Sequence, residues 1–383
     1  MHDRAGKLIN NLSSEMKYFS LLPRLLPPDP PLEYDMEMVN LLTVANRSIG
    51  KLNGVSQNAP DIDLFTAMYI RKEALLSSQI EGTQATIDDI LDPDIDANIN
   101  QDIEEVLSYI KATHFAAKKI LELPICNRFI KETHKILMAN SRGEEKTPGE
   151  FRRSQNWIGP IGGLINNARF IPPNQKDMEL AMSDLEKFIN AEDDLDIIVK
   201  TALIHYQFET IHPFLDGNGR IGRLLISLFL MEQNILQYET LYISYYLKRH
   251  RSEYYDRLNA VRDSGHFEEW IKFFIRAVNE SAIDAIDAID SLVKLHNINT
   301  SRVKEIKGRE GVTLNKVFRY IEHSPIINIS NTSKELGMSY NAVSGAVNRL
   351  LVMQILSKIS NQKRNRIFIY TDYLNILRKG TVD

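Results

Sequence analysis

The sequence predicts a predominantly helical protein, and three observations support this fold class. Apolar residues recur every three or four positions along most of the 383-residue chain, which is the spacing of amphipathic helices. Paired strand-like runs occur at two places, residues 156–171 and 355–371. Five prolines between positions 23 and 31 forbid a helix there, so we expect residues 1–32 to form an extended arm that packs on the first helices.

Length and composition narrow the classes of function. The chain is long enough for two or three domains. Its net charge of −4, from 46 basic and 50 acidic residues, gives no global reason to expect nucleic acid or a membrane as partner. The single cysteine, Cys126, excludes an intramolecular disulfide framework. The N-terminus lacks an apolar leader and no run of about 18 apolar residues occurs, so we expect a cytoplasmic protein without a membrane-spanning segment.

The helices of the first 300 residues follow from the apolar spacing and from the residues at their ends. Gly54 and Gly82 stand near two predicted helix ends, where a left-handed residue is common. Residues 141–149 have the composition of a loop, and residues 156–171 are predicted to form a β-hairpin around a glycine-containing turn. We predict helices over residues 33–54, 64–80, 88–91, 103–123, 127–140, 175–191, 194–210, 219–234 and 266–295.

The pattern changes in the last 80 or so residues. A short helix is followed by a helix, a tight turn and a second helix over 340–351, and two strand-like runs then enclose a basic turn with Lys363 and Arg364. A helix–turn–helix with a two-stranded wing is the winged-helix pattern. Such domains bind DNA or protein, and the second helix has Arg349 as its only basic residue, so both partners stay open. We expect an N-terminal part (1–110), a central core (111–300) and a winged-helix domain (301–383).

Residues 211–225, which read I-H-P-F-L-D-G-N-G-R-I-G-R-L-L, carry the strongest chemical signal. The glycines let the loop turn sharply and present free N–H groups at the start of the next helix, where anions bind. Arg220 and Arg223 are three residues apart and share one helix face, from which they can clamp two phosphate groups. Asp216 suits Mg²⁺, which usually binds through one or two carboxylates plus substrate phosphates. His212 suits proton transfer near neutral pH.

This run matches without a gap the signature H-x-F-x-[DE]-G-N-G-R-x-x-R, so the chain resembles the Fic family. The resemblance implies a Fic-type helical bundle that transfers AMP from ATP to a Ser, Thr or Tyr hydroxyl of a target protein. It implies that His212 is the catalytic base and that Mg²⁺ is held by Asp216. It also implies that ATP and its phosphates are bound by Phe214, Leu215, Asp216, Gly217, Asn218, Gly219, Arg220 and Arg223.

The end of the second predicted helix reads S-S-Q-I-E-G over residues 77–82. On composition alone this is a helix end with an incidental glutamate, although a carboxylate there opposes the helix dipole and hints at a nearby cation. The pattern S-x-x-x-E-G is similar to the inhibitory motif of Fic proteins that carry their own inhibitory helix. The resemblance assigns Ser77, Glu81 and Gly82 to this motif and pairs Glu81 with Arg223, in the place that the γ-phosphate of ATP needs.

Two further regions take a role only from the resemblance. The hairpin is as readily an ordinary surface hairpin, but in Fic proteins a flap here holds an extended target segment by main-chain pairing. The resemblance therefore implies target contacts at Ile158, Gly159, Ala168 and Phe170. The tyrosine-rich segment after residue 240 has the spacing of core residues, whereas its R-S-x-Y-Y context resembles that of the Fic tyrosines beside adenine and ribose. This implies base contacts for Tyr254 and Tyr255.

Other functions stay open at the level of sequence. The donor could be another nucleotide, although Arg223 and the inhibitory glutamate favour a triphosphate. The chain could also be a DNA-binding transcriptional regulator whose Fic domain modifies the chain itself. The target protein and the oligomeric state, including a homodimer, are not given by the sequence.

Overall fold

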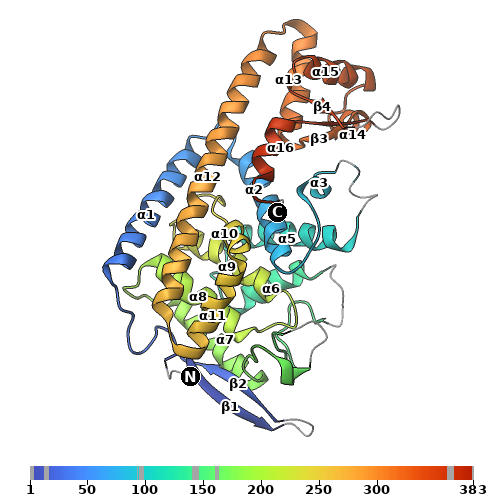
Figure 1. The fold of residues 1–383 in the computed structure, drawn as a ribbon. Helices are drawn as coiled ribbons and strands as arrows, with labels where there is room; N and C mark the ends of the chain where they lie inside the picture. Colours follow the sequence, from blue (N-terminus) through green and yellow to red (C-terminus); the bar gives the residue numbers. More distant parts are fainter. Residues whose placement is uncertain are drawn as a thin grey trace.

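The computed structural model describes residues 4–12, 17–92, 94, 99–139, 146–159, 164–359 and 366–381. The protein is mainly helical, as predicted, and the longest helix runs along most of the molecule (Figure 1). This helix, α12 (Phe267–Lys304), packs along α1 (Met36–Gln57) and links the central bundle to the C-terminal elements (Figure 1).

The N-terminal segment differs from the extended arm that we expected. Strands β1 (Gly6–Leu12) and β2 (Lys17–Pro23) form an antiparallel hairpin in which Gly6 lies opposite Pro23. In the first strand two apolar residues, Leu8 and Ile9, are followed by two asparagines, so the sequence shows no polar–apolar alternation there. Leu21 of β2 is 1% exposed, and its N–H donates to the carbonyl of Ile171 at 3.0 Å. The hairpin therefore supports the segment that leads to the candidate site.

Most predicted helices are present, with shifted ends. Helix α1 continues past Gly54 to Gln57, so this glycine does not end the helix. A Cβ atom at Gly54 would meet open space. Its first turn is capped by Asp35, whose carboxylate accepts from the N–H of Met38 at 2.8 Å. The other helices of the bundle are α2 (Ile62–Ile80), α3 (Ile87–Ile90), α5 (Gln101–Lys119), α6 (Asn127–Leu137), α7 (Gln175–Asn190), α8 (Ile197–Ile211), α9 (Asn218–Glu232), α10 (Ser244–Arg249) and α11 (Arg251–Ser264).

Helices α8 and α9 form the centre of the bundle. Every residue of α8 from Ile198 to Ile211 is buried, and α9 is buried over most of its length. A helix that is covered on all sides cannot shift without disturbing its neighbours. The loop between these two helices, residues 212–217, is therefore held at both ends by the core.

The C-terminal region has the expected order of elements with two additions, strand β3 and helix α16. Its helices are α13 (Gly308–His323), α14 (Ile329–Glu335), α15 (Tyr340–Val352) and α16 (Thr371–Arg378), and its strands are β3 (Ile326–Asn328), β4 (Ser357–Lys358) and β5 (Ile367–Ile369). The strands form an antiparallel sheet in the order β3-β5-β4, so a third strand joins the two that we predicted. The turn with Lys363 and Arg364 lies outside the described residues, and DNA binding through this region stays a prediction.

The C-terminal region packs against the bundle. Helix α16 contacts both α12 and α2. Arg378 of α16 donates to the carboxylate of Asp88 at 2.6 Å, and Lys379 forms an ion pair with Asp284 of α12 at 3.0 Å. Helix α12 also ends at Lys304, slightly beyond the boundary that we drew at residue 300. The C-terminal elements are thus in direct contact with the helix that ends in Glu81.

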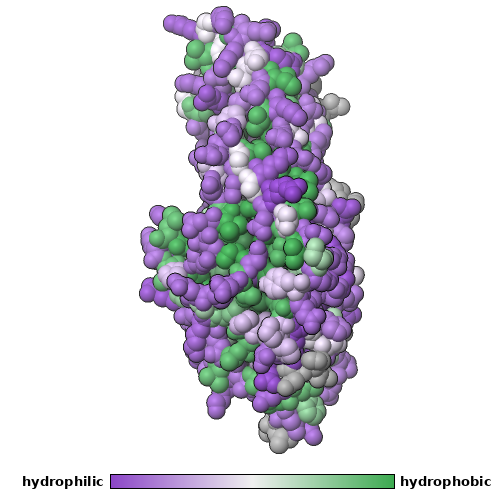
Figure 2. Space-filling view, turned by 90° about the vertical axis from the view of Figure 1, so that its left-hand side faces the viewer, coloured by the Kyte–Doolittle hydropathy of each residue, from purple (hydrophilic) through white to green (hydrophobic). Residues whose placement is uncertain are grey.

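The surface on the α1 side is mostly hydrophilic, with hydrophobic residues gathered near the middle of this face (Figure 2). Among the described residues, no helix is both long enough and apolar enough to cross a membrane.

Candidate active site

The loop between α8 and α9 is fixed by two left-handed residues. His212 ends α8 with φ 51° and ψ 61°, and Gly217 precedes α9 with φ 77°. Glycine takes this conformation freely, whereas for a histidine it is uncommon and is retained only where the surroundings impose it. Within the described part of the chain, no side chain caps the first turn of α9. The N–H groups of that turn therefore face the loop, as the sequence predicts.

The side chain of Asn218 stabilises the loop through two hydrogen bonds to its backbone. Its side-chain oxygen accepts from the N–H of Phe214 at 2.8 Å, and its side-chain nitrogen donates to the carbonyl of the same residue at 2.8 Å. The ring of Phe214 is fully buried and stacks on the ring of His134, with centroids 3.6 Å apart. Phe214 and Asn218 therefore shape the loop and do not line it.

His134 of α6 connects the loop to the segment before the flap. Its Nδ1 accepts from the N–H of Gly149 at 2.9 Å, so Nε2 carries the proton and donates to the carbonyl of Asp216 at 3.0 Å. Burial lowers the pKa of His134 to about 4, which keeps this neutral tautomer near pH 7. The sequence did not single out His134, because a histidine among apolar helix positions has no distinguishing pattern.

Two side chains before the flap hold the backbone of His212. Arg152 is fully buried, and its Nε donates to the carbonyl of His212 at 3.0 Å. The side chain of Asn156 donates to the carbonyl of Phe214 at 2.9 Å and to that of His212 at 3.3 Å. These contacts give Arg152 a structural role beside the loop. Asn156 was missed, since an asparagine in a loop carries no specific signal.

The imidazole of His212 is held in its neutral form. It is partly exposed, and its Nδ1 is a buried atom with no hydrogen-bond partner in the described part of the chain. Burial lowers the pKa of His212 to about 4, and the charges of Arg262 and Arg152 act in the same direction. The ring is therefore neutral near pH 7 and can act as a base.

Arg220 has two donors without a hydrogen-bond partner among the described residues. It is 3% exposed, and among the described residues its Nε and Nη1 have no hydrogen-bond partner. The carboxylate of Glu105 is 3.7 Å from Nη1, and that of Asp216 is 3.4 Å from Nη2. Buried guanidinium donors are costly to leave unpaired. This side chain therefore fits an anion at the start of α9.

Asp216 is the only sequence-predicted metal ligand, and Lys146 contacts it. The ammonium of Lys146 donates to Oδ2 at 2.8 Å. Burial raises the pKa of Asp216, but the bond from Lys146 and the charge of Arg220 outweigh this and hold it below its usual range. No cluster of three or more metal-ligating side chains occurs in the described residues. One carboxylate fits a Mg²⁺ ion that takes its other ligands from phosphates and water.

Arg223 lies at the centre of an ion-pair contact between α9 and α2. Its Nε donates to Oγ of Ser77 at 2.8 Å, and its Nη2 donates to the carbonyl of Ser77 at 2.9 Å and to Oε1 of Glu81 at 2.7 Å. The side chain of Arg223 is 1% exposed and that of Glu81 is 40% exposed. Gly82 follows with φ 110°, as expected for a helix end.

Gly219 makes room for this contact. A Cβ atom at Gly219 would lie 2.3 Å from Oε1 of Glu81 and 3.0 Å from Nη1 of Arg223. The carboxylate of Glu81 therefore sits directly over the first turn of α9, in the space that only a glycine leaves open. This is the position predicted for Glu81 from the resemblance.

The flap is narrower than the hairpin we predicted. Ile158 and Phe170 form a single antiparallel bridge, with Ile158 N–H donating to the Phe170 carbonyl at 2.9 Å. Gly159 lies close to Ala168, and a short 3₁₀ helix (η2, Ile165–Asn167) lies in the predicted turn, just before the second strand-like run. Residues 160–163 at the turn lie outside the described residues. The guanidinium of Arg262 covers the ring of Phe170 at 3.9 Å and ties the flap to the end of α8.

Two parts of the chain match known protein families. Residues 39–118 match the Fic/DOC family N-terminal region, and residues 124–230 match the Fic/DOC family. The chain therefore contains a Fic domain, preceded by a Fic N-terminal region. It is 31% identical over 173 residues to the protein adenylyltransferase Fic of Culex quinquefasciatus and 32% identical over 170 residues to that of Drosophila erecta. These segments cover 45% and 44% of this chain, and 30% of each relative.

Solved Fic structures share the fold. A Fic family protein from Desulfovibrio desulfuricans G20 superposes with a TM-score of 0.57 and 19% identity, over 89% of this chain and 97% of that one. A Fic domain containing signaling protein from Bacteroides thetaiotaomicron superposes with a TM-score of 0.51 and 18% identity, over 66% and 97% of the two chains. These matches confirm the Fic-type helical fold.

The structure differs from the prediction for one of the two tyrosines, Tyr254 and Tyr255. Tyr254 is 1% exposed, and its hydroxyl lies 2.9 Å from Nε2 of His205. Nδ1 of His205 lies 3.0 Å from the carbonyl of Gly222, so it donates there and Nε2 accepts from Tyr254. The prediction that Tyr254 contacts the base is wrong for this conformation, because its ring is packed in the core. Tyr255 is 37% exposed, and its contact with the base stays a prediction.

Two buried carboxyl groups near Arg223 were missed in the sequence. Burial raises the pKa of Glu73 to about 7 and that of Glu209 to about 7. Glu73 accepts from the hydroxyl of Ser244, and Oε1 of Glu209 has no partner among the described groups. Both lie on helices with strongly apolar surroundings, α2 and α8. No sequence spacing identifies them, since they come together only through helix packing around Arg223.

Proposed function

We propose that this Fic protein transfers AMP from ATP to a hydroxyl side chain of a target protein. The observation that carries the proposal is a neutral histidine, His212, beside a loop with two buried arginines at a helix N-terminus. A proton acceptor next to a set of cationic donors is what nucleotidyl transfer to a hydroxyl requires. Relatives that align with this region are named protein adenylyltransferase Fic, which supports the same reaction.

His212 acts as the base in the proposed reaction. The target hydroxyl oxygen attacks the α-phosphorus while its proton passes to the imidazole. The bond from the α-phosphorus to the bridging oxygen of the β-phosphate breaks, and pyrophosphate leaves. Because burial keeps the pKa of His212 low, at about 4, the ring is ready to accept a proton throughout the neutral range. The bonds from Arg152 and Asn156 to its carbonyl keep the ring in position.

The phosphates are held at the first turn of α9. Arg220 brings two donors that have no partner among the described groups, and Gly217 and Gly219 let the backbone approach the anion. Arg223 supplies a second guanidinium for the γ-phosphate once Glu81 has left it. Asp216 would hold Mg²⁺, which when bound neutralises charge that develops on the phosphates. This requires Lys146 to move away from Asp216.

We further propose that Glu81 keeps the enzyme in a resting state. Its carboxylate occupies Nη2 of Arg223, the donor that the γ-phosphate would use. Both partners belong to one chain, so the inhibition does not need another protein. Arginine stays charged at all ordinary pH values, and the pKa of Glu81 lies below its usual range. The ion pair therefore stays intact as long as the pH is above the pKa of Glu81. Release needs a movement of α2 or a competing ligand.

The flap holds the target in this scheme. Ile158 and Phe170 pair with each other through main-chain bonds next to the loop of His212. An extended segment of the target could add to this pair by the same kind of bond. Self-modification follows the same chemistry, with a hydroxyl of this chain as acceptor.

Labelled ATP tests the proposed reaction. Wild type and His212→Ala are incubated with protein extract and ATP labelled either on the α-phosphate or on the γ-phosphate. We expect protein labelling from the α-label alone, and a loss of about 10²–10⁴-fold in His212→Ala. His323→Ala, at an exposed histidine of α13, serves as control and should label like wild type.

Three results would count against the proposal. Transfer of the γ-label would show phosphoryl transfer in place of AMP transfer. Equal labelling by His212→Ala would remove the histidine from the reaction. More efficient labelling from another nucleotide donor would favour the alternative donor.

A further inference from the structure

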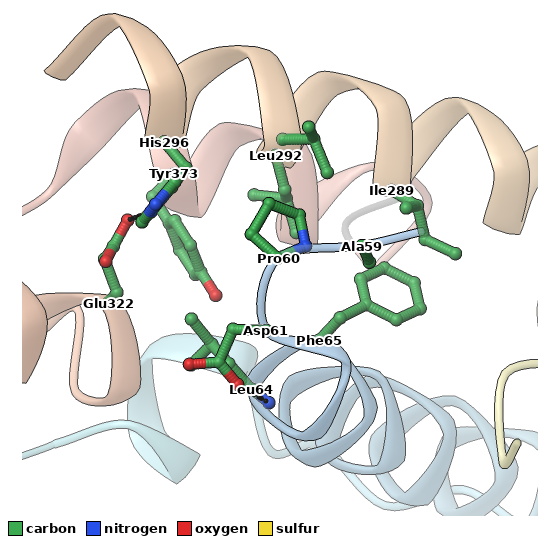
Figure 3. Close-up of a pocket in the computed structure, with 11 residues that line it drawn as sticks. Ala59, Pro60, Asp61, Leu64, Phe65, Ile289, Leu292, His296, Glu322 and Tyr373 are labelled. Atoms are coloured by element: carbon green, nitrogen blue, oxygen red, sulfur yellow. Dashed lines mark hydrogen bonds and ion pairs between the residues drawn. The ribbon is translucent and has the colours of Figure 1, made fainter. Parts of the chain in front are cut away.

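A cavity opens at the end of α2 that lies away from Glu81 (Figure 3). Its walls come from the first turn of α2 and the loop before it, from α12, and from α13 and α16 of the C-terminal region (Figure 3). Most of the lining is apolar, including Leu64, Phe65, Ile289 and Leu292. The space free of protein atoms is about 400 Å³ with its open mouth included.

One end of the cavity is polar and rich in acceptors. Tyr373 is 3% exposed, and its hydroxyl has no hydrogen-bond partner in the described part of the chain. Figure 3 shows this hydroxyl directed into the space near Asp61. The carboxylates of Asp61 and Glu322 also line the cavity. The imidazole of His296 also lines this end and is already engaged, because its Nδ1 lies 2.7 Å from Oε1 of Glu322.

We propose that this cavity binds a small apolar amine. A buried hydroxyl without a partner is unusual in a folded protein and calls for one. Two carboxylates and a phenol oxygen complement an ammonium group, which has three donors and no acceptor. The hydrocarbon part of the ligand fills the apolar walls, and its ammonium group reaches Tyr373 and Asp61. A neutral or anionic ligand of the same shape lacks this complementarity.

The cavity is connected to the candidate active site by one helix. Helix α2 runs without a break from Ile62 to Ile80, about 27 Å at 1.5 Å per residue. Asp61 caps its start, and its other end carries Glu81 on Arg223. The cavity has its present shape while Glu81 is engaged. A ligand that fits this shape stabilises the engaged state, so it lowers AMP transfer. This second step rests on the inhibition proposed above.

Binding is tested first, without the transfer reaction. Benzylamine is titrated calorimetrically into the full chain, with benzyl alcohol as the uncharged counterpart. Ala59→Phe fills the partly exposed mouth of the cavity, and Tyr373→Phe removes the unpartnered hydroxyl. Tyr340→Phe, at a tyrosine that is 49% exposed on α15, is the matched control. We expect saturable binding of benzylamine that each cavity variant weakens about tenfold, while Tyr340→Phe binds like wild type.

Other outcomes would overturn the site. The site is wrong if benzylamine does not bind wild type saturably. It is also wrong if Ala59→Phe or Tyr373→Phe binds benzylamine as tightly as wild type, or if benzyl alcohol binds wild type with equal affinity. Circular dichroism of each variant verifies that it is folded before it is titrated.

Regulation is tested next. At saturating benzylamine we expect labelling by wild type to fall about fivefold, whereas Glu81→Gly should not respond. Unchanged wild-type labelling at saturation would overturn the coupling through α2. The proposed inhibition itself is tested without benzylamine. If Glu81→Gly is then no more active than wild type, the inhibition fails independently of the cavity.

Discussion

Glu81 accepts a hydrogen bond from Arg223 at 2.7 Å, across 142 residues of chain. The contact joins the end of α2 to the first turns of α9, directly over Gly219. It is also accessible, since the side chain of Glu81 is 40% exposed. A partly exposed contact that occupies a buried arginine can be displaced by a stronger anion without unfolding the core.

Removal of the Glu81 carboxylate should activate the enzyme. We expect Glu81→Gly to raise labelling of protein, including this chain itself, by about tenfold or more, because Arg223 becomes free for the γ-phosphate. The measurement is the rate of incorporation from ATP labelled on the α-phosphate. Glu192→Gly, in an exposed loop before α8, is the matched control and should leave the rate unchanged. A flat or lower rate in Glu81→Gly would make Glu81 a structural cap of α2.

A methyl group at Gly219 should disturb the same contact. The added Cβ of Gly219→Ala would lie 2.3 Å from Oε1 of Glu81, so the carboxylate must move. We expect Gly219→Ala to lower the free energy of unfolding by about 1–3 kcal/mol in wild type, and by much less when Glu81→Gly is also present. Urea unfolding of the four proteins in the cycle measures this coupling.

The control for this cycle is another glycine in a helix. Gly50 of α1 has open space around it, so Gly50→Ala should raise the stability by about 0.5–1 kcal/mol. Its effect should be the same with and without Glu81→Gly. If the effects of Gly219→Ala and Glu81→Gly on the free energy of unfolding are also strictly additive, then a side chain at position 219 does not compete with Glu81 for space.

The sequence predicts the central loop well, because its residues are close together in the chain. The glycines, the asparagine and the arginines of residues 212–223 act within a single turn and helix start, so spacing alone brings them together. The contact between Glu81 and Arg223 could be predicted only from the resemblance, since no local pattern links residues so far apart. The structure agrees with that placement.

Other features depend on packing that the sequence does not encode locally. His134, Arg152 and Asn156 act on backbone carbonyls of the loop, and such contacts leave no mark in the spacing of residues. Tyr254 fits both a core position and a base contact by its pattern, and only its bond to His205 distinguishes the two. Burial and partners, not residue type, decide these roles.

Lys146 should compete with the metal for Asp216. Its ammonium donates to Oδ2 of Asp216 at 2.8 Å, so the cation must be displaced before the carboxylate can hold Mg²⁺. We expect Lys146→Ala to lower the Mg²⁺ concentration that gives half-maximal labelling, and Asp216→Asn to raise it. Lys187→Ala, which removes an exposed ion pair on α7, should match wild type. If Lys146→Ala needs more Mg²⁺, then Lys146 assists the reaction directly.

His134 should make the folded protein sensitive to acid. Burial lowers its pKa to about 4 in the folded state, against about 6.5 when unfolded. Above pH 6.5 both states carry the neutral ring. As the pH falls from 6.5 towards 4, the unfolded chain binds a proton that the folded chain does not, so stability is lost over that window. The size of this loss is about 2–3 kcal/mol between pH 7 and pH 4.5.

The difference between wild type and His134→Gln isolates this effect. Glutamine can still donate to the carbonyl of Asp216 but does not titrate. The free energy of unfolding of His134→Gln should therefore fall less on acidification than that of wild type. Buried carboxyl groups such as Glu73 and Glu209, whose pKa values burial raises to about 7, act in the opposite direction and cancel in the comparison. His266→Gln, at an exposed histidine, should give a curve parallel to wild type. Parallel curves for His134→Gln would mean that His134 is protonated in the folded state, with its bond from Gly149 broken.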